Sequence, residues 1–167
     1  MSSDPEARLR ELITNHTSSL VKYIERRTFA IPGFAVPDAV GETWIVVWKN
    51  ITKVPQGGEL PWLLGVARNV VRNQLRSMQR RSHYEHKAKS QEFMSSVEDD
   101  VAAKSRVQDA LLALDEADRE TLMLHYWDGL DVAAIAQVLS VSTNAAAVKL
   151  SRAKKKFEVS MSSESSE

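Results

Sequence analysis

The chain has 167 residues, enough for one domain or two small ones, and its apolar content of 43% allows a buried core. It contains no cysteine, no apolar run long enough to span a bilayer and no signal peptide, so we expect a cytoplasmic protein without disulfides, zinc knuckles or cysteine nucleophiles. The net charge is zero, but residues 66–91 are basic and residues 92–131 acidic, so local fields still allow nucleic acid as a partner.

The first half of the chain shows helical periodicity. A first amphipathic helix is marked by Leu9, Leu12, Ile13, Leu20 and Ile24. The chain breaks at Ile-Pro-Gly (31–33), and we interpret Asp38 to Asn50 as a buried helix because five apolar residues run from Trp44 to Trp48. Residues 53–59 then form a loop. Pro61 opens a long helix, at the first helical position that tolerates proline, and this helix runs to about Arg81.

The long helix carries a second basic feature. Its arginines recur every four residues and form a slowly turning stripe: Arg68, Arg72, Arg76 and Arg80. Asn69 and Asn73 lie beside the stripe, and Trp62 stands at the helix start. Cationic side chains bind phosphates, aromatic rings stack on bases and amides hydrogen-bond to base edges, so this pattern favours single-stranded or partly opened DNA. The loop before the helix could receive an extruded base. The alternative is a solvated surface helix with Trp62 in the core.

The second half of the chain follows a polar segment. We expect a domain at residues 1–82, a linker at 83–105, a second helical domain at 106–158 and a disordered tail at 159–167. The overall expectation is therefore an all-α fold of two small helical domains joined by a polar linker, the second a four-helix domain.

Residues 130–157 read as a helix-turn-helix. Asp131 caps a first helix with one apolar face, Val141 plugs the turn, and Ser142 caps a second helix. The second helix buries a stripe formed by Ala146, Leu150, Ala153 and Phe157. Lys149, Arg152 and Lys156 lie on another face, with Thr143, Asn144 and Ala145 at the helix start. Such a helix suits phosphate and base-edge contacts in the major groove, whereas the alternative is a solvated basic helix at the end of a bundle.

Together the two halves resemble the extracytoplasmic-function sigma factors, the small two-domain initiation subunits of bacterial RNA polymerase. Residues 110–154, ending in SxNAAAVKLSRAK, resemble the family's promoter-binding region four. PDAVGETWIVVW (37–48) resembles its polymerase-docking helix, and PWLLGVARNVVRNQLRSMQRR (61–81) resembles its melting and recognition helix. Four positions depart from the family pattern: Gly41 stands where Gln is usual, Asn73 where Asp is common, Asp115 where Pro is common, and Ser140 where the turn usually has Gly.

The resemblance implies a division of labour between two DNA sites. The minus-ten element would contact Gly57, Gly58, Glu59, Trp62, Arg68, Asn69, Arg72, Asn73, Arg76 and Arg80. The minus-thirty-five element would contact Ser142, Thr143, Asn144, Ala145, Lys149, Arg152 and Lys156. The polymerase-docking face would hold Asp38, Val40, Gly41 and Glu42.

The partners implied are core RNA polymerase, through the clamp helices of its largest subunit and the flap of the second, promoter DNA, and an anti-sigma factor of the kind that commonly restrains the family. No catalytic group, cofactor, metal or membrane is implied, because polymerase supplies the chemistry. One alternative is a stand-alone helix-turn-helix regulator that binds DNA without polymerase. Another is a metal-dependent enzyme using His83, Glu85, His86 and Glu92, a weak signal in a polar linker.

Overall fold

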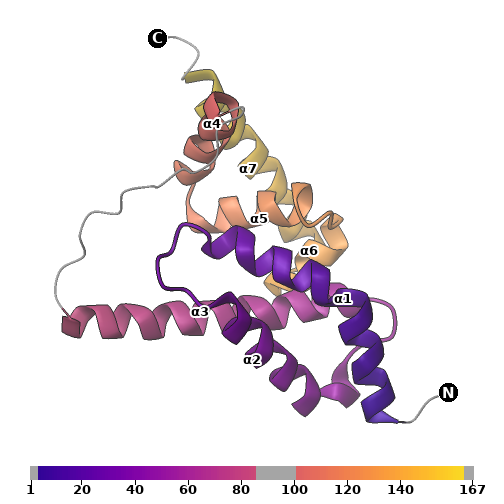
Figure 1. The fold of residues 1–167 in the computed structure, drawn as a ribbon. Coiled ribbons are helices and arrows are strands. Elements are labelled where there is room, and N and C mark those ends of the chain that lie inside the picture. Colours follow the sequence, from indigo (N-terminus) through magenta and orange to yellow (C-terminus); the bar gives the residue numbers. More distant parts are fainter. Residues whose placement is uncertain (1–3, 86–100, 164–167) are drawn as a thin grey trace. The chain divides into compact units, whose positions relative to one another are not determined.

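The structure is a computed structural model that describes residues 4–85 and 101–163. Over these residues it contains seven α-helices, one short 3-10 helix and no strand (Figure 1). The chain divides into two compact units, Met1–Phe93 and Met94–Glu167, which we call the N-terminal and C-terminal domains and describe separately. The all-α, two-domain fold expected from the sequence is confirmed.

The N-terminal domain consists of α1 (Pro5–Thr28), α2 (Val36–Lys49), η1 (Ile51–Lys53) and α3 (Glu59–Glu85). Helix α1 packs against both α2 and α3, and α2 packs against α3. Each α-helix buries one stripe, because a helix turns once in about 3.6 residues and can present only one face to the core. The buried apolar side chains are Leu12, Leu20, Tyr23, Ile24, Ala39, Val47, Val54, Leu63, Leu64, Ala67, Val70 and Val71.

Helix α2 is present as predicted, but it is not a buried helix. It begins at Val36, with Pro37 in its first turn, and its buried residues are Ala39, Thr43 and Val47. These three recur every four residues, so the run of apolar residues cannot all face the core. Ile45 and Trp48 point outward and are 55% and 44% exposed.

Helix α3 begins and ends beyond its predicted limits. It starts at Glu59, so Pro61 occupies the third helical position instead of the first. This costs no helical hydrogen bond, because the first N–H groups of a helix have no partner within the helix. The helix continues past Arg81 to Glu85, and α4 already begins at Val101, so the expected linker is helical at both of its ends.

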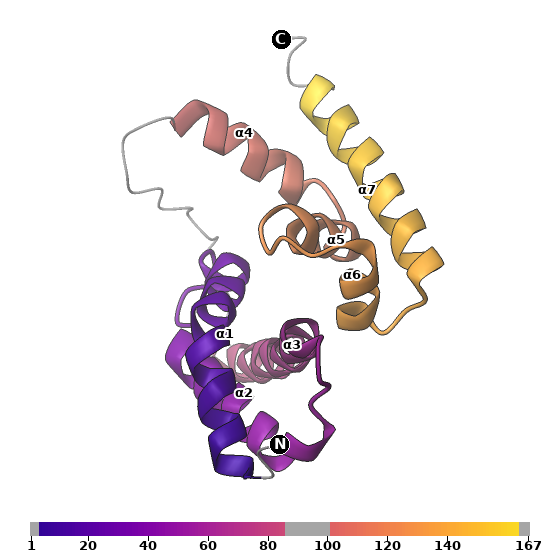
Figure 2. The same ribbon diagram turned by 90° about the vertical axis from the view of Figure 1, so that its right-hand side faces the viewer.

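The C-terminal domain consists of α4 (Val101–Leu112), α5 (Glu116–Tyr126), α6 (Val132–Leu139) and α7 (Thr143–Ser163), the four helices expected. Helices α4, α5 and α6 all pack against α7, and Figure 2 shows the tight turn between α6 and α7. The buried apolar side chains are Ala110, Leu114, Leu122, Leu124, Leu130, Ile135, Ala136, Val138, Ala146, Leu150 and Ala153. Helix α7 continues to Ser163, so the prediction of a disordered tail is wrong for residues 159–163. These residues extend an existing helix, and each further residue adds one hydrogen bond without a new nucleation step.

The helix-turn-helix forms through the expected caps. The Asp131 carboxylate accepts a hydrogen bond from the Ala134 N–H at 2.8 Å, and the Ser142 hydroxyl oxygen accepts one from the Ala145 N–H at 3.1 Å. Between them Ser140 adopts a left-handed conformation with φ 55°, which lets the Val141 N–H donate to the Ala136 carbonyl at 3.0 Å. Helices α6 and α7 consequently meet at a bend of 103°.

Over the described residues, no single helix is long and apolar enough to cross a membrane. The pair formed by α6 and α7 reaches the required length and apolar composition only when its two bent helices are taken together.

Ser140→Gly is expected to stabilise the C-terminal domain by about 0.5–1 kcal/mol, because glycine adopts a positive φ without the steric cost of a Cβ atom. Hydrogen exchange of peptides from α6 and α7, followed by mass spectrometry on the full chain, measures this as slower exchange. Ser140→Ala is the matched control, since it loses the hydroxyl but keeps the Cβ. Equal exchange in Ser140→Gly and Ser140→Ala would show that a Cβ atom at residue 140 has no steric cost in this turn.

Candidate nucleic-acid interface

The exposed face of α3 lies opposite its buried stripe. Asn69, Asn73, Arg76 and Arg80 are exposed and recur at spacings of three and four, and the partly exposed Trp62 lies on the same line seven residues before Asn69. All five residues were predicted as DNA contacts. They place an aromatic ring, two amides and two guanidinium groups along one side of a helix, which is a combination that suits a nucleic-acid strand.

The predicted arginine stripe is only partly on this face. A spacing of four residues turns by about 40° more than one helical turn, so the stripe winds around α3. Arg68 and Arg72 are half-buried at its edge, whereas Arg76 and Arg80 stand clear of the domain. With the described residues, none of the four arginines forms an ion pair or side-chain hydrogen bond. The two exposed arginines therefore carry the charge that this face offers to a ligand.

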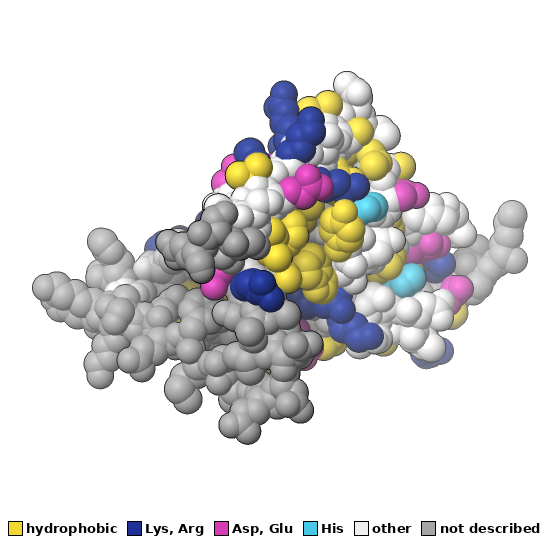
Figure 3. All heavy atoms as spheres, turned by 90° about the horizontal axis from the view of Figure 1, so that it is seen from above, with side chains coloured by type: hydrophobic (Ala, Val, Ile, Leu, Met, Phe, Trp, Pro, Cys, Tyr) yellow, Lys and Arg dark blue, Asp and Glu magenta, His cyan; other side chains and the backbone are white. Residues whose placement is uncertain are grey.

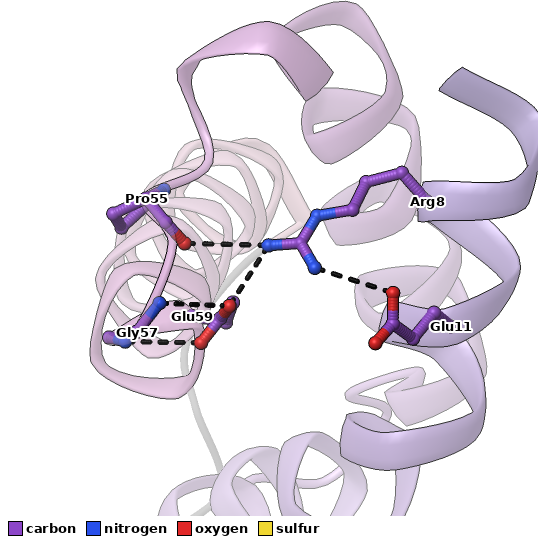
Figure 4. Close-up of polar contacts among 6 residues, drawn as sticks. Arg8, Glu11, Pro55, Gly57 and Glu59 are labelled. Carbon is purple, nitrogen blue, oxygen red and sulfur yellow. Dashed lines mark hydrogen bonds and ion pairs between the residues drawn. The ribbon is translucent and has the colours of Figure 1, made fainter. Parts of the chain in front are cut away.

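The loop before α3 is held by a single carboxylate (Figure 4). Glu59 Oε1 accepts hydrogen bonds from Arg8 Nη2 at 2.9 Å and from the Gly57 N–H at 3.1 Å, and Oε2 accepts from the Gly58 N–H at 3.1 Å. Arg8 also donates to the Pro55 carbonyl at 3.5 Å and lies 3.5 Å from the Glu11 carboxylate. We call Arg8, Glu59, Gly57 and Gly58 the loop clasp.

The clasp explains the electrostatics of Glu59. The hydrogen bond from Arg8, followed by those from the loop amides, lowers the pKa of Glu59 from 4.5 to about 2. Gly57 and Gly58 both have positive φ, 74° and 123°, which turns both of their N–H groups toward one carboxylate. Sequence reasoning placed Gly57, Gly58 and Glu59 among DNA contacts. The structure gives them an internal role, in which Glu59 fixes the shape of the loop.

The predicted polymerase-docking face on α2 is acidic at one end and apolar at the other. Asp38, Gly41 and Glu42 are exposed and Val40 is half-buried. Glu42 Oε2 accepts a hydrogen bond from Gln74 Nε2 at 2.7 Å, which ties α2 to α3. Sequence reasoning missed the apolar continuation of this face, the exposed residues Ile45 and Trp48, although their spacing of seven and ten residues from Asp38 was a usable signal.

The N-terminal half of α7 presents a broader surface than the sequence suggested. Ser142, Thr143, Asn144 and Arg152 are exposed as predicted, and Ala145 and Lys149 are half-buried at its edge. Four further residues of this helix that were not predicted are also exposed: Ala147, Val148, Ser151 and Lys155. Ala147, Val148 and Ser151 carry no charge and gave no basic signal, whereas Lys155 is one turn from the predicted Arg152 and could have been included.

Lys156 differs from the other basic residues predicted to contact DNA because its ammonium group already forms an ion pair with described residues. Its Nζ donates to Asp118 Oδ2 at 2.6 Å and lies 3.9 Å from Asp115 Oδ2. The hydrogen bond to Asp118 raises the pKa of Lys156 above its ordinary value. Asp115 in turn caps α5 by accepting from the Asp118 N–H at 2.8 Å, so the aspartate that replaces the family's proline starts a helix. Lys156 therefore ties α7 to the start of α5.

Exposed hydrophobic side chains gather on the face drawn in Figure 3, with Lys and Arg side chains beside them. In the C-terminal domain the largest exposed hydrophobic side chains are those of Tyr126 and Trp127, which are 60% and 39% exposed. Their rings meet edge to face at 6.5 Å, and Lys154 Nζ lies 5.7 Å from the centre of the Tyr126 ring. This pair gives the domain an aromatic surface at the end of α5.

The described residues contain no group of three metal-binding side chains. Of the residues behind the metal-enzyme alternative, His86 and Glu92 lie outside the described part of the chain.

Comparison with known proteins identifies the C-terminal domain. The family of sigma-70, region 4, matches residues 104–157. The matched residues span most of the C-terminal domain. Among solved structures, CnrH in complex with the cytosolic domain of CnrY is 23% identical with a TM-score of 0.64, covering 97% of this chain and 92% of that one. Among the curated proteins compared, none matches this chain.

A second solved structure, the sigma factor RpoE of Bartonella quintana in complex with the anti-sigma factor NepR, is 16% identical with a TM-score of 0.67. It covers 92% of this chain and 96% of that one. At these identities the likeness concerns the fold, and it extends over both domains. With the region 4 match, it confirms the resemblance to extracytoplasmic-function sigma factors predicted from the sequence.

Glu59→Gln is expected to destabilise the N-terminal domain by roughly 1–2 kcal/mol at pH 7, because a neutral amide replaces a carboxylate that accepts three hydrogen bonds. Since the pKa of Glu59 is lower in the folded state, its contribution is complete above about pH 4.5 and is lost as the pH falls toward 2. The difference between wild type and variant therefore shrinks between pH 5 and pH 3.

Urea unfolding followed by tryptophan fluorescence measures the free energy of unfolding of the N-terminal domain. It is done in a Trp127→Phe background, where the three remaining tryptophans all lie in that domain. Glu11→Gln is the matched control: it also lies beside Arg8, but its side chain is 60% exposed, and we expect little change. A difference in free energy of unfolding between wild type and Glu59→Gln that stays constant from pH 7 to pH 3 would contradict the role of Glu59 in the loop clasp.

Proposed function

We propose that this chain is a transcription initiation factor that binds core RNA polymerase and directs it to specific promoters. The observation that carries the proposal is the region 4 domain, with an exposed recognition helix, on the same chain as a second domain whose long helix exposes Trp62, two asparagines and two arginines. Neither DNA-facing surface needs a catalytic group, because polymerase supplies the chemistry.

In this proposal the N-terminal domain engages the minus-ten element. The line from Trp62 to Arg80 follows the melted strand: the ring stacks on a base, the amides of Asn69 and Asn73 reach base edges, and Arg76 and Arg80 neutralise phosphates. The loop clasp supports this role, because a loop held by Arg8 and Glu59 presents a fixed surface to an extruded base and loses little entropy on binding.

The docking face on α2 would bind the clamp helices of the largest polymerase subunit. Asp38 and Glu42 supply negative charge for a basic partner, and Ile45 and Trp48 supply exposed apolar area. Charged groups guide association, whereas buried aromatic anchors supply most of the affinity. The C-terminal domain would bind the flap of the second subunit and place α7 in the major groove of the minus-thirty-five element.

A restraining partner is part of the proposal. RpoE was solved with an anti-sigma factor, and CnrH was solved with the cytosolic domain of CnrY. We propose that a protein of this kind restrains the present chain by covering surfaces that polymerase needs.

Reconstitution with core RNA polymerase of the host bacterium, followed by transcription-start mapping on genomic DNA fragments, tests the function. The proposal expects a complex that starts transcription at a shared sequence pattern, with no such starts from core polymerase alone. Tight binding to an operator without any polymerase binding would contradict it and would favour the stand-alone helix-turn-helix regulator.

Arg76→Ala combined with Arg80→Ala is expected to weaken promoter opening by the holoenzyme and to reduce its salt dependence. Each arginine that neutralises a single-strand phosphate adds about 0.7 to the slope of log K against log salt, so the double variant loses about 1.4. Potassium permanganate reactivity of unpaired thymines, measured across a salt series, reports both effects.

Arg10→Ala combined with Arg26→Ala is the charge-matched control on α1 of the same domain, and we expect it to leave the slope unchanged. A wild-type slope in the Arg76 and Arg80 variant would remove this face from DNA contact.

A further inference from the structure

The outward face of α7 has an apolar centre. Ala146, Leu150 and Ala153 form its buried stripe and are 0%, 5% and 0% exposed. One residue turns a helix by about 100°, so Val148, two positions from both Ala146 and Leu150, points directly away from this stripe. Val148 is accordingly 40% exposed, and Ala147 beside it is exposed as well.

Polar and cationic side chains surround this valine. Asn144 and Arg152 lie one helical turn before and after Val148, Ser151 lies three residues after it and Lys155 seven, and all four are exposed. Arg152 and Lys155 form no ion pair with any described residue, so their charges are available to a ligand. Lys149 and Lys156, which the sequence singled out, are seven residues apart and therefore lie along the same edge of this face.

The position of Val148 on the helix limits what it can contact. It lies in the second turn of α7, and a recognition helix inserts its N-terminal turns into the major groove. A valine can neither donate nor accept a hydrogen bond. The apolar group that base pairs present in the major groove is the C5 methyl of thymine. A cationic rim of Arg152 and Lys155 fits a groove between phosphates, so the surface suits duplex DNA better than an apolar protein partner.

We propose that Val148 is a specificity-determining contact that reads the C5 methyl group of a thymine in the upstream promoter element. Asn144 and Arg152 contact the neighbouring base edges or phosphates, and Ala147 leaves room for the groove wall to approach. The proposal rests on the proposed function and adds to it one chemical group that the upstream element must contain. It does not depend on Lys156, whose charge is held by Asp118.

Deoxyuridine substitution tests this contact, since uracil pairs as thymine does and lacks only the methyl group. The promoter is first mapped with the wild-type holoenzyme, and each thymine of its upstream element is then replaced singly. Holoenzyme affinity is expected to fall about three- to five-fold at one thymine, the effect of losing one buried methyl group. In Val148→Ala this sensitivity is expected to disappear, while Val148→Thr, which keeps a methyl group, retains it.

Val159→Ala is the matched control, because Val159 is a 68% exposed valine on the same helix, three turns farther along. It is expected to show the wild-type response to uracil. A functional holoenzyme that tolerates uracil at every position, or a Val148→Ala variant as sensitive as wild type, overturns the methyl contact alone. Failure to form a holoenzyme that starts at the unmodified promoter overturns the proposed function as well, and is seen before any uracil is introduced.

Discussion

The central constraint on this protein is that each helix can bury only one stripe. In α7 the burial of Ala146 and Leu150 forces Val148 outward, and in α3 the burial of Ala67 and Val71 leaves Asn73 on the opposite side. The residues on the outward faces therefore do not contribute to the core. On both helices this outward face carries groups suited to nucleic acid. Helix α3 presents one aromatic ring, two amides and two arginines, and α7 presents an apolar centre surrounded by cationic side chains.

Helical periodicity does not determine the conformation of loops or the contacts between helix ends, and ion pairs hold two of these in place. The loop clasp sets the loop before α3 through Arg8 and Glu59, and Lys156 with Asp118 ties the end of the helix-turn-helix to α5. Both pairs consume charge internally, so a basic or acidic residue in this chain is not automatically a ligand contact. Among the described residues, Arg76 and Arg80 on α3 and Arg152 on α7 form no ion pair, so the proposed function assigns the phosphate contacts to them.

Local signals carried most of the sequence prediction. The caps Asp131 and Ser142 and the helical stripes lie within a few residues of one another, so the helix-turn-helix could be read directly. The ion pairs could not, because Arg8 and Glu59 are 51 residues apart and Lys156 and Asp118 are 38 apart. Burial was also misjudged where one stretch is apolar on every side, since periodicity alone does not say which side the domain covers. The DNA and polymerase contacts stay predictions.

In the proposed function, the DNA-binding surfaces of the two domains act together only when polymerase sets the distance between them. Transcription from a mapped promoter whose two elements are moved apart by five base pairs tests this most directly. The account predicts that the holoenzyme loses most of its activity on the lengthened promoter, while binding of the free chain to the upstream element is unchanged. Equal transcription from both promoters would contradict it.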